Sequence, residues 1–207
     1  MELIVAKLCG FCAGVSHTIK KAKEILENSN ENIYCLGEII HNESVIKSLE
    51  DQGMITVNSL DEIPDNSKVI FRAHGEAKEI YEKAASKNLE VIDLTCGKVR
   101  IIHNKVEKAA TDSFIIIIGK KNHPETIGTF GYAKPNSFII ENQEDIEEAV
   151  NSINASHLNK VYIVAQTTFN DDKFDLLVNE LQSKIKKELI VDKTICDATK
   201  NRQEEVK

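Results

Sequence analysis

The sequence lacks any apolar run that approaches the roughly 20 residues a membrane-spanning helix needs. Its first ten residues hold one lysine and no small-residue cleavage pattern, so no signal peptide is expected. We therefore expect a cytoplasmic protein with no membrane partner.

The chain also lacks an excess of positive charge. Its formal net charge is −7, whereas proteins that bind nucleic acid usually carry a basic surface. We therefore expect no nucleic-acid partner. The 207 residues, of which 42% are hydrophobic and 29% charged, suit one large or two small globular domains.

The five cysteines are an odd number, and in a reducing compartment they favour metal or redox chemistry over a disulfide framework. Cys9 and Cys12 form a C-x-x-C that, read alone, predicts a thioredoxin-like redox pair. As half of a zinc site it would need a second close pair, which the sequence does not contain. Cys35 is expected to be a buried strand residue.

Short apolar runs alternate with stretches of helical period along the whole chain. This alternation predicts an α/β fold of small parallel sheets flanked by helices. Strands are expected at 2–6, 32–36, 68–72, 90–93, 113–118, 137–140, 160–165 and 189–192. Helices are expected at 16–27, 43–52, 77–86, 99–110, 125–132, 144–153 and 171–187.

A repeat underlies this alternation: Cys12, Cys96 and Cys196 each follow an apolar strand and precede a helix. The repeat predicts two α/β lobes, at 14–95 and 97–195, with 1–13 and 196–207 as the remnant of a truncated third lobe. Ligands bind beyond the carboxyl ends of parallel strands, and helix N-termini favour anions. We therefore expect pseudo-repeated lobes around one central metal site.

Three thiolates suit an iron–sulfur cluster and leave one coordination position open for a substrate oxygen. The residues alone do not separate iron–sulfur from zinc. Three histidines, His41, His74 and His123, are expected at strand-to-helix turns, where they would bind a phosphate or, alternatively, cap and pack. The other three, at 17, 103 and 157, are expected at the surface or in packing.

Glu125 follows Pro124 at the expected start of a helix. It is either a first-turn acid that stabilises the helix dipole or a proton donor whose pKa burial raises. Thr167 and Thr168 would either cap the next helix or bond a substrate hydroxyl and relay protons.

Seven motifs, taken in order, resemble the 4-hydroxy-3-methylbut-2-enyl diphosphate reductase family. The resemblance covers the whole chain. The motifs are Gly10-Phe-Cys-Ala-Gly-Val15, His41-Asn42, Ala73-His-Gly75, Asp93-Leu-Thr-Cys-Gly97, His123-Pro-Glu-Thr-Ile-Gly128, Gln166-Thr-Thr168 and Ile195-Cys-Asp-Ala-Thr-Lys-Asn-Arg-Gln203.

This resemblance implies the last step of the methylerythritol phosphate route to isoprenoids, at a 4Fe-4S cluster. In the family the substrate's hydroxyl binds the unique iron, two electrons and two protons remove it as water, and protonation of an allyl species gives isopentenyl or dimethylallyl diphosphate. Ferredoxin or flavodoxin supplies the electrons. The family's roles fall on these positions: cluster ligands Cys12, Cys96 and Cys196; diphosphate ligands His41, His74 and His123; proton donor Glu125; substrate contact Thr167.

The sequence departs from the family pattern in three places. Gly97 stands where many members have proline, Cys9 is an extra thiol, and the chain ends at Lys207, where members continue into a third lobe that also binds the diphosphate. Two alternatives remain: a thiol–disulfide oxidoreductase that uses Cys9 and Cys12, and a non-catalytic fragment that binds metal or diphosphate.

Overall fold

The computed structural model describes residues 9–206, so the strand expected at 2–6 lies outside the described residues. The chain divides into two compact units. We call Phe11–Arg100 the first unit; the second unit runs from Ile101 onward and also takes in Cys9 and Gly10.

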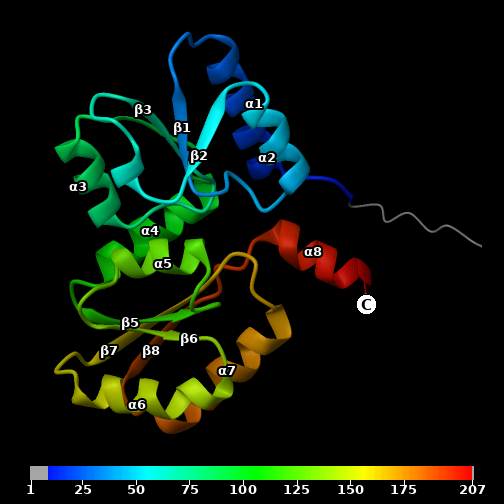
Figure 1. Cartoon of the computed structure of the whole chain (residues 1–207). Helices are drawn as coiled ribbons and strands as arrows, with labels where there is room; N and C mark the ends of the chain where they lie inside the picture. The colour runs from blue at the N-terminus through cyan, green and yellow to red at the C-terminus, as the bar shows by residue number, and fades with distance from the viewer. Residues whose placement is uncertain (1–8, 207) are drawn as a thin grey trace, which may run out of the picture. The chain divides into compact units, whose positions relative to one another are not determined.

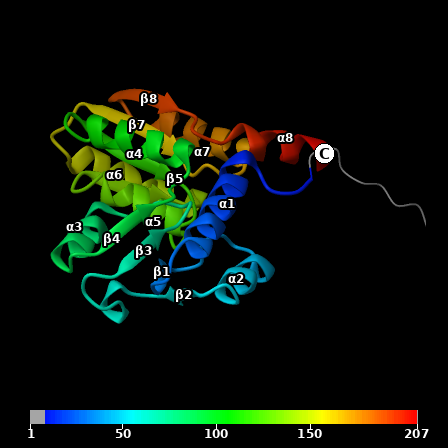
Figure 2. The same ribbon diagram turned by 90° about the horizontal axis from the view of Figure 1, so that it is seen from above.

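The first unit is a parallel four-stranded sheet of order β2-β1-β3-β4 with helices on both faces (Figures 1 and 2). Helices α1 and α2 pack on one face, and α3 packs on the other. The strands are β1 (Ile33–Leu36), β2 (Met54–Val57), β3 (Lys68–Phe71) and β4 (Glu90–Asp93). The helices are α1 (Ala13–Glu27), α2 (Glu43–Glu50) and α3 (Lys78–Ser86), with a 3-10 turn at Leu60–Glu62.

The second unit repeats this plan with a parallel sheet of order β6-β5-β7-β8. Its strands are β5 (Ser113–Ile118), β6 (Ser137–Ile140), β7 (Lys160–Ala165) and β8 (Glu188–Asp192). Its helices are α5 (Pro124–Gly131), α6 (Ile146–Ala155), α7 (Asp171–Lys184) and α8 (Asp197–Val206), with a 3-10 turn at Gln143–Asp145; α4 (Gly97–Ala109) spans the division between the units. None of the described helices combines the length and apolar character needed to cross a membrane.

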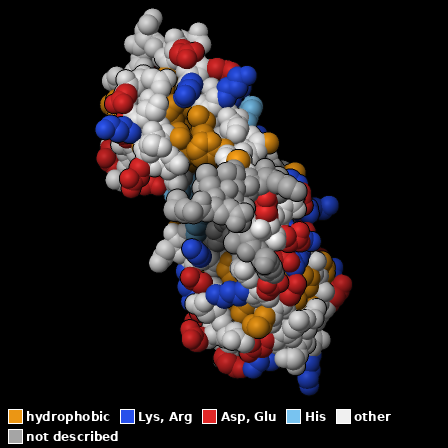
Figure 3. Space-filling view, turned by 90° about the vertical axis from the view of Figure 1, so that its right-hand side faces the viewer, with side chains coloured by type: hydrophobic (Ala, Val, Ile, Leu, Met, Phe, Trp, Pro, Cys, Tyr) orange, Lys and Arg blue, Asp and Glu red, His pale blue; other side chains and the backbone are white. Residues whose placement is uncertain are grey.

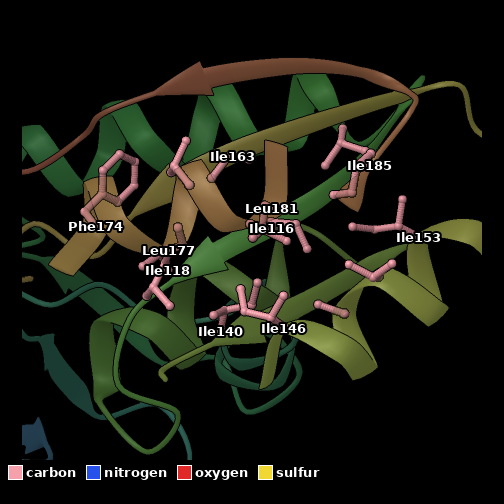
Figure 4. Close-up of a cluster of buried hydrophobic side chains, with 14 of the residues drawn as sticks. Ile116, Ile118, Ile140, Ile146, Ile153, Ile163, Phe174, Leu177, Leu181 and Ile185 are labelled. Atoms are coloured by element: carbon pink, nitrogen blue, oxygen red, sulfur yellow. The ribbon is translucent and has the colours of Figure 1, made fainter. Parts of the chain in front are cut away.

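The core of the second unit follows from strand β5, in which all six residues are buried. Side chains alternate across a strand, so Ile116 and Ile118 pack on one face with α6 and α7, as Figure 4 shows. Ile115 and Ile117 face α4 and α5. A central strand buried on both faces reads as a continuous apolar run, as this one does.

The predicted fold class is confirmed: two small parallel sheets, each flanked by helices, in the same strand order. All seven strands predicted within the described residues are present. The sequence-based prediction missed β2, a four-residue edge strand in which Ile55 is exposed. So short and half-exposed a strand leaves little periodic signal.

Among the predicted helices, two boundaries differ from the prediction by three residues, and the others differ by two or fewer. The first helix begins at Ala13, three residues early, because the Cys12 sulfur caps it and accepts a hydrogen bond from Val15 N at 3.5 Å. The helix expected at 171–187 ends at Lys184, because Ile185 takes extended backbone angles and turns its side chain into the core.

Candidate functional site

Two of the predicted metal ligands, Cys12 and Cys96, come together in the first unit. A methyl group placed on Gly14 would lie 2.9 Å from the Cys96 sulfur and 3.9 Å from the Cys12 sulfur. Both thiols are partly buried and free of disulfides. Because Gly14 has no side chain, the two sulfurs can lie close to each other beside its backbone. We call this space beside Gly14 the Gly14 cradle.

The first unit also brings His41 and His74 together. Their ring centroids are 4.5 Å apart, with the planes inclined by 34°. His41 is exposed, and its Nδ1 lies 3.1 Å from Glu38 Oε2. Each ring follows the carboxyl end of a strand, His41 after β1 and His74 after β3, so the parallel sheet places them at one edge.

In the second unit Glu125 and Thr167 form a buried hydrogen-bonded pair. Glu125 is only 3% exposed. The Thr167 hydroxyl donates to Glu125 Oε2 at 2.7 Å, and Thr167 N donates to Oε1 at 2.5 Å. Burial raises the pKa of the Glu125 carboxyl, although both hydrogen bonds oppose the rise.

The third cysteine, Cys196, lies beside this pair. Its backbone N–H donates to Thr167 O at 2.9 Å, and its carbonyl accepts from Thr199 and Lys200 in the first turn of α8. Cys196 is partly buried and free of disulfides. The second unit therefore joins one predicted metal ligand, through the backbone of Thr167, to the hydrogen-bond partner of the predicted proton donor.

His123 is the N-cap of α5, and its Nδ1 accepts the Glu125 backbone N–H at 3.2 Å. An imidazole that accepts at Nδ1 carries the proton of its neutral form on Nε2. The capping role weighed for this histidine is therefore present. Thr168 is exposed and accepts a hydrogen bond from the Gln166 side chain at 2.8 Å.

The remaining cysteines and histidines separate by environment. Cys35 is fully buried, as predicted, and burial raises the pKa of its thiol to about 12. Cys9 is exposed. His17 and His157 lie at the surface, while His103 is buried and stacks on Tyr132 with ring centroids 4.4 Å apart.

Sequence reasoning missed two charged residues that flank the predicted histidine of the first unit. Arg72 and Glu76 form an ion pair with Arg72 Nε 2.9 Å from Glu76 Oε1. Both side chains are largely buried. Opposite charges directly on either side of the Ala73-His74-Gly75 motif are a signal that the sequence does carry.

A groove of about 590 Å³ runs beside α1 and α2 and contains none of the predicted site side chains. It is lined in part by Phe11, Ile19, Lys20 and Glu24, and Figure 3 faces this side, where apolar side chains lie among charged ones. Since its lining carries both signs of charge, the groove does not indicate a charged ligand.

Comparison with known proteins shows that the chain is similar to proteins named as reductases. It matches the family model described as LytB protein over residues 3–207. The curated 4-hydroxy-3-methylbut-2-enyl diphosphate reductase of Clostridioides difficile (strain 630) is 37% identical over 208 residues, which cover 100% of this chain and 73% of that protein. The enzyme of the same name from Aquifex aeolicus (strain VF5) is also 37% identical, over 100% of this chain and 70% of its own length.

Two solved structures share the fold. The E-1-hydroxy-2-methyl-but-2-enyl-4-diphosphate reductase from Plasmodium falciparum matches with a TM-score of 0.86 and 39% identity, over 94% of this chain and 61% of that one. An (E)-4-hydroxy-3-methyl-but-2-enyl diphosphate reductase, described as the terminal enzyme of the non-mevalonate pathway, matches with a TM-score of 0.82 and 38% identity, over 99% of this chain and 71% of that one. This chain thus spans between 61% and 73% of the length of these four relatives.

Proposed function

Since this chain belongs to the LytB protein family, we propose that it reductively removes the hydroxyl group of 4-hydroxy-3-methylbut-2-enyl diphosphate. The products are isopentenyl and dimethylallyl diphosphate. Two electrons and two protons are consumed: the carbon–oxygen bond breaks, one proton leaves with the hydroxyl as water, and the other forms a carbon–hydrogen bond. The observation that carries the proposal is the buried Glu125–Thr167 pair beside Cys196.

The three free thiols fit an iron–sulfur cluster. The sulfurs of Cys12 and Cys96 converge over the Gly14 cradle, and thiolates are the usual ligands of such clusters. Zinc has no redox chemistry and would not carry the two electrons that the reaction needs. We therefore propose a 4Fe-4S cluster on Cys12, Cys96 and Cys196, which when bound supplies electrons and an iron that holds the substrate oxygen.

Glu125 is the proposed proton donor. Burial raises the pKa of its carboxyl and so favours the protonated form, and a general acid works best when its pKa lies near the working pH. Thr167 orients this carboxyl through two hydrogen bonds and presents its hydroxyl to the substrate.

The diphosphate is assigned to the histidines. His41 and His74 lie together in the first unit, and His123 caps the N-terminus of α5, where the helix dipole favours negative charge. A ferredoxin or flavodoxin is proposed as the electron donor and the cytoplasm as the location; both come from the sequence resemblance and composition.

The test is turnover by the anaerobically purified and reconstituted chain. With reduced viologen as electron source, we expect a brown protein that converts the hydroxylated diphosphate to the two isoprenoid diphosphates, with one water formed per two electrons consumed. A chain that stays colourless after iron–sulfur reconstitution would contradict the cluster. Binding of the diphosphate without product would instead support the non-catalytic fragment.

Replacing Gly14 tests the cradle. In Gly14→Ala the new methyl group would meet the Cys96 sulfur at 2.9 Å, so the thiol must turn away. We expect iron affinity to fall by roughly tenfold or more, since misplacing a ligand costs about that much. The free energy of unfolding should change by no more than about 1 kcal/mol, because a thiol at the end of a short side chain can rotate.

Gly97→Ala is the matched control, because it changes a first-turn glycine next to Cys96 where a methyl group would meet nothing within 4 Å. Iron content per chain after reconstitution measures both variants. Equal iron content in the two would show that the Gly14 cradle is not needed.

A further inference from the structure

Arg72 and Glu76 enclose His74 in the segment that joins β3 to α3. Arg72 Nε donates to Glu76 Oε1 at 2.9 Å, and the two side chains are only 17% and 10% exposed. Within the segment, Gly75 takes a φ of +74° and its N–H donates to Arg72 O at 3.1 Å. The ion pair therefore brackets a short turn that contains His74.

The Arg72 guanidinium reaches across to the neighbouring segment and lies on Gly37. A methyl group on Gly37 would lie 2.2 Å from Arg72 Nη1 and 2.8 Å from Cζ, and Gly37 has a φ of +69°. Both facts require glycine there. Gly37 is itself held to β2, since its N–H donates to Val57 O at 2.7 Å.

Gly37 begins the segment that leads from β1 to His41, so the guanidinium links the two segments that carry the paired histidines. His41 lies on one of these segments and His74 on the other, and the centroids of their rings are 4.5 Å apart. Arg72 forms an ion pair with Glu76 and is largely buried, so its charged group faces these two segments and is mostly shielded from solvent.

We propose that Arg72, held on Gly37 by Glu76, is a positioning residue that fixes the His41 and His74 rings relative to each other and so sets the affinity of the site for a diphosphate. The choice of a diphosphate as the ligand rests on the proposed function. The link that Arg72 makes between the two segments does not depend on that function. A flat guanidinium packed on a bare backbone can hold this arrangement, whereas a flexible ammonium cannot.

Binding of inorganic pyrophosphate to the full chain, measured by titration calorimetry, tests the proposal. Arg72→Met and Glu76→Met should each weaken binding by roughly tenfold, because small displacements of preorganised groups cost about this much. The Glu76 variant is decisive: removing a negative charge near an anion site should by electrostatics alone tighten binding, whereas loss of positioning weakens it.

Lys68→Met is the matched control. It removes the same charge from the other end of β3, where Lys68 pairs with Glu31 and Glu90, and should leave binding within about twofold because surface charges are screened. Tighter binding in Glu76→Met together with weaker binding in Arg72→Met would overturn the proposal in favour of direct contact between Arg72 and the anion. Unchanged binding in both would also overturn it.

The imidazole NMR signals of His41 and His74 in the anion-free protein give a second measurement. Both rings should shift together in Arg72→Met, in Gly37→Ala and also in Arg72→Lys, because lysine retains the charge but lacks the flat guanidinium that packs on Gly37. If the unaltered chain does not bind pyrophosphate, the diphosphate assignment fails, and these signals still decide the positioning role. Unmoved rings in Arg72→Met and Gly37→Ala would overturn it.

Discussion

Cys12→Ser, Cys96→Ser and Cys196→Ser should each abolish the visible absorption of the anaerobically reconstituted chain and lower turnover by more than about 100-fold. The reason is that each removes one of the three proposed thiolate ligands, and even the loss of a group that only supports a ligand costs roughly 10–100-fold. Iron and sulfide content per chain, together with the absorption spectrum, measures the effect.

Cys9→Ser is the matched control, because it removes an exposed thiol three residues from Cys12. We expect it to retain the cluster and full turnover. Loss of activity in Cys9→Ser, with a thiol–disulfide reductase activity in the unaltered chain, would favour the C-x-x-C alternative. A Cys196→Ser variant with normal iron content would remove that residue from the ligand set.

Glu125→Gln should lower turnover by roughly 10²–10⁴-fold, the usual contribution of a general acid, while iron content stays unchanged. Glutamine retains the size and much of the hydrogen bonding to Thr167 but cannot release a proton. Glu148→Gln is the control, since Glu148 is an exposed first-turn glutamate of α6 in the same unit. Full turnover in Glu125→Gln would take Glu125 out of the mechanism.

The pH dependence of turnover and that of the free energy of unfolding should both reflect titration of the Glu125 carboxyl. Burial raises the pKa of Glu125 above its usual 4.5, so the folded chain holds this proton more tightly than the unfolded chain does. The contribution of Glu125 to the free energy of unfolding should therefore be greatest below pH 4.5. This contribution should be lost as the pH rises through the raised pKa of Glu125.

Turnover should decline over the same interval as the acid loses its proton, and Glu125→Gln should lack this part of the stability profile. Chemical denaturation across a pH series provides the measurement. A stability profile that is identical in Glu125→Gln and the unaltered chain would mean that the Glu125 pKa is not raised.

Local sequence pattern was enough to predict most of the fold. Strand β5 is six consecutive buried residues, and β7 is bounded as predicted, because runs of Val and Ile between polar turns are recognisable without any partner. The edge strand β2 escaped prediction because four residues with mixed burial carry almost no period. The start of α1 also escaped, because a cysteine cap is not among the usual capping residues.

The candidate site likewise has features that could be predicted from the sequence and features that could not. The cysteines, histidines and Glu125 could be singled out by their place at strand ends, since parallel strands direct ligands to their carboxyl edge. The convergence of two sulfurs over Gly14 and the contact of Arg72 with Gly37 could not be singled out. A glycine in a sequence does not say which distant side chain takes the space it leaves.

By itself, then, the sequence determined the α/β class and the family, and it singled out the residues that we propose to hold iron or a proton. Only the tertiary structure decided which of them meet: Thr167 donates to Glu125 across 42 residues of chain, and the His41 and His74 ring centroids lie 4.5 Å apart. The physical reason is that periodicity and capping act over a few residues, whereas strand order and register choose neighbours between segments far apart in the chain. Burial, which raises the Glu125 pKa, exists only once those neighbours are in place.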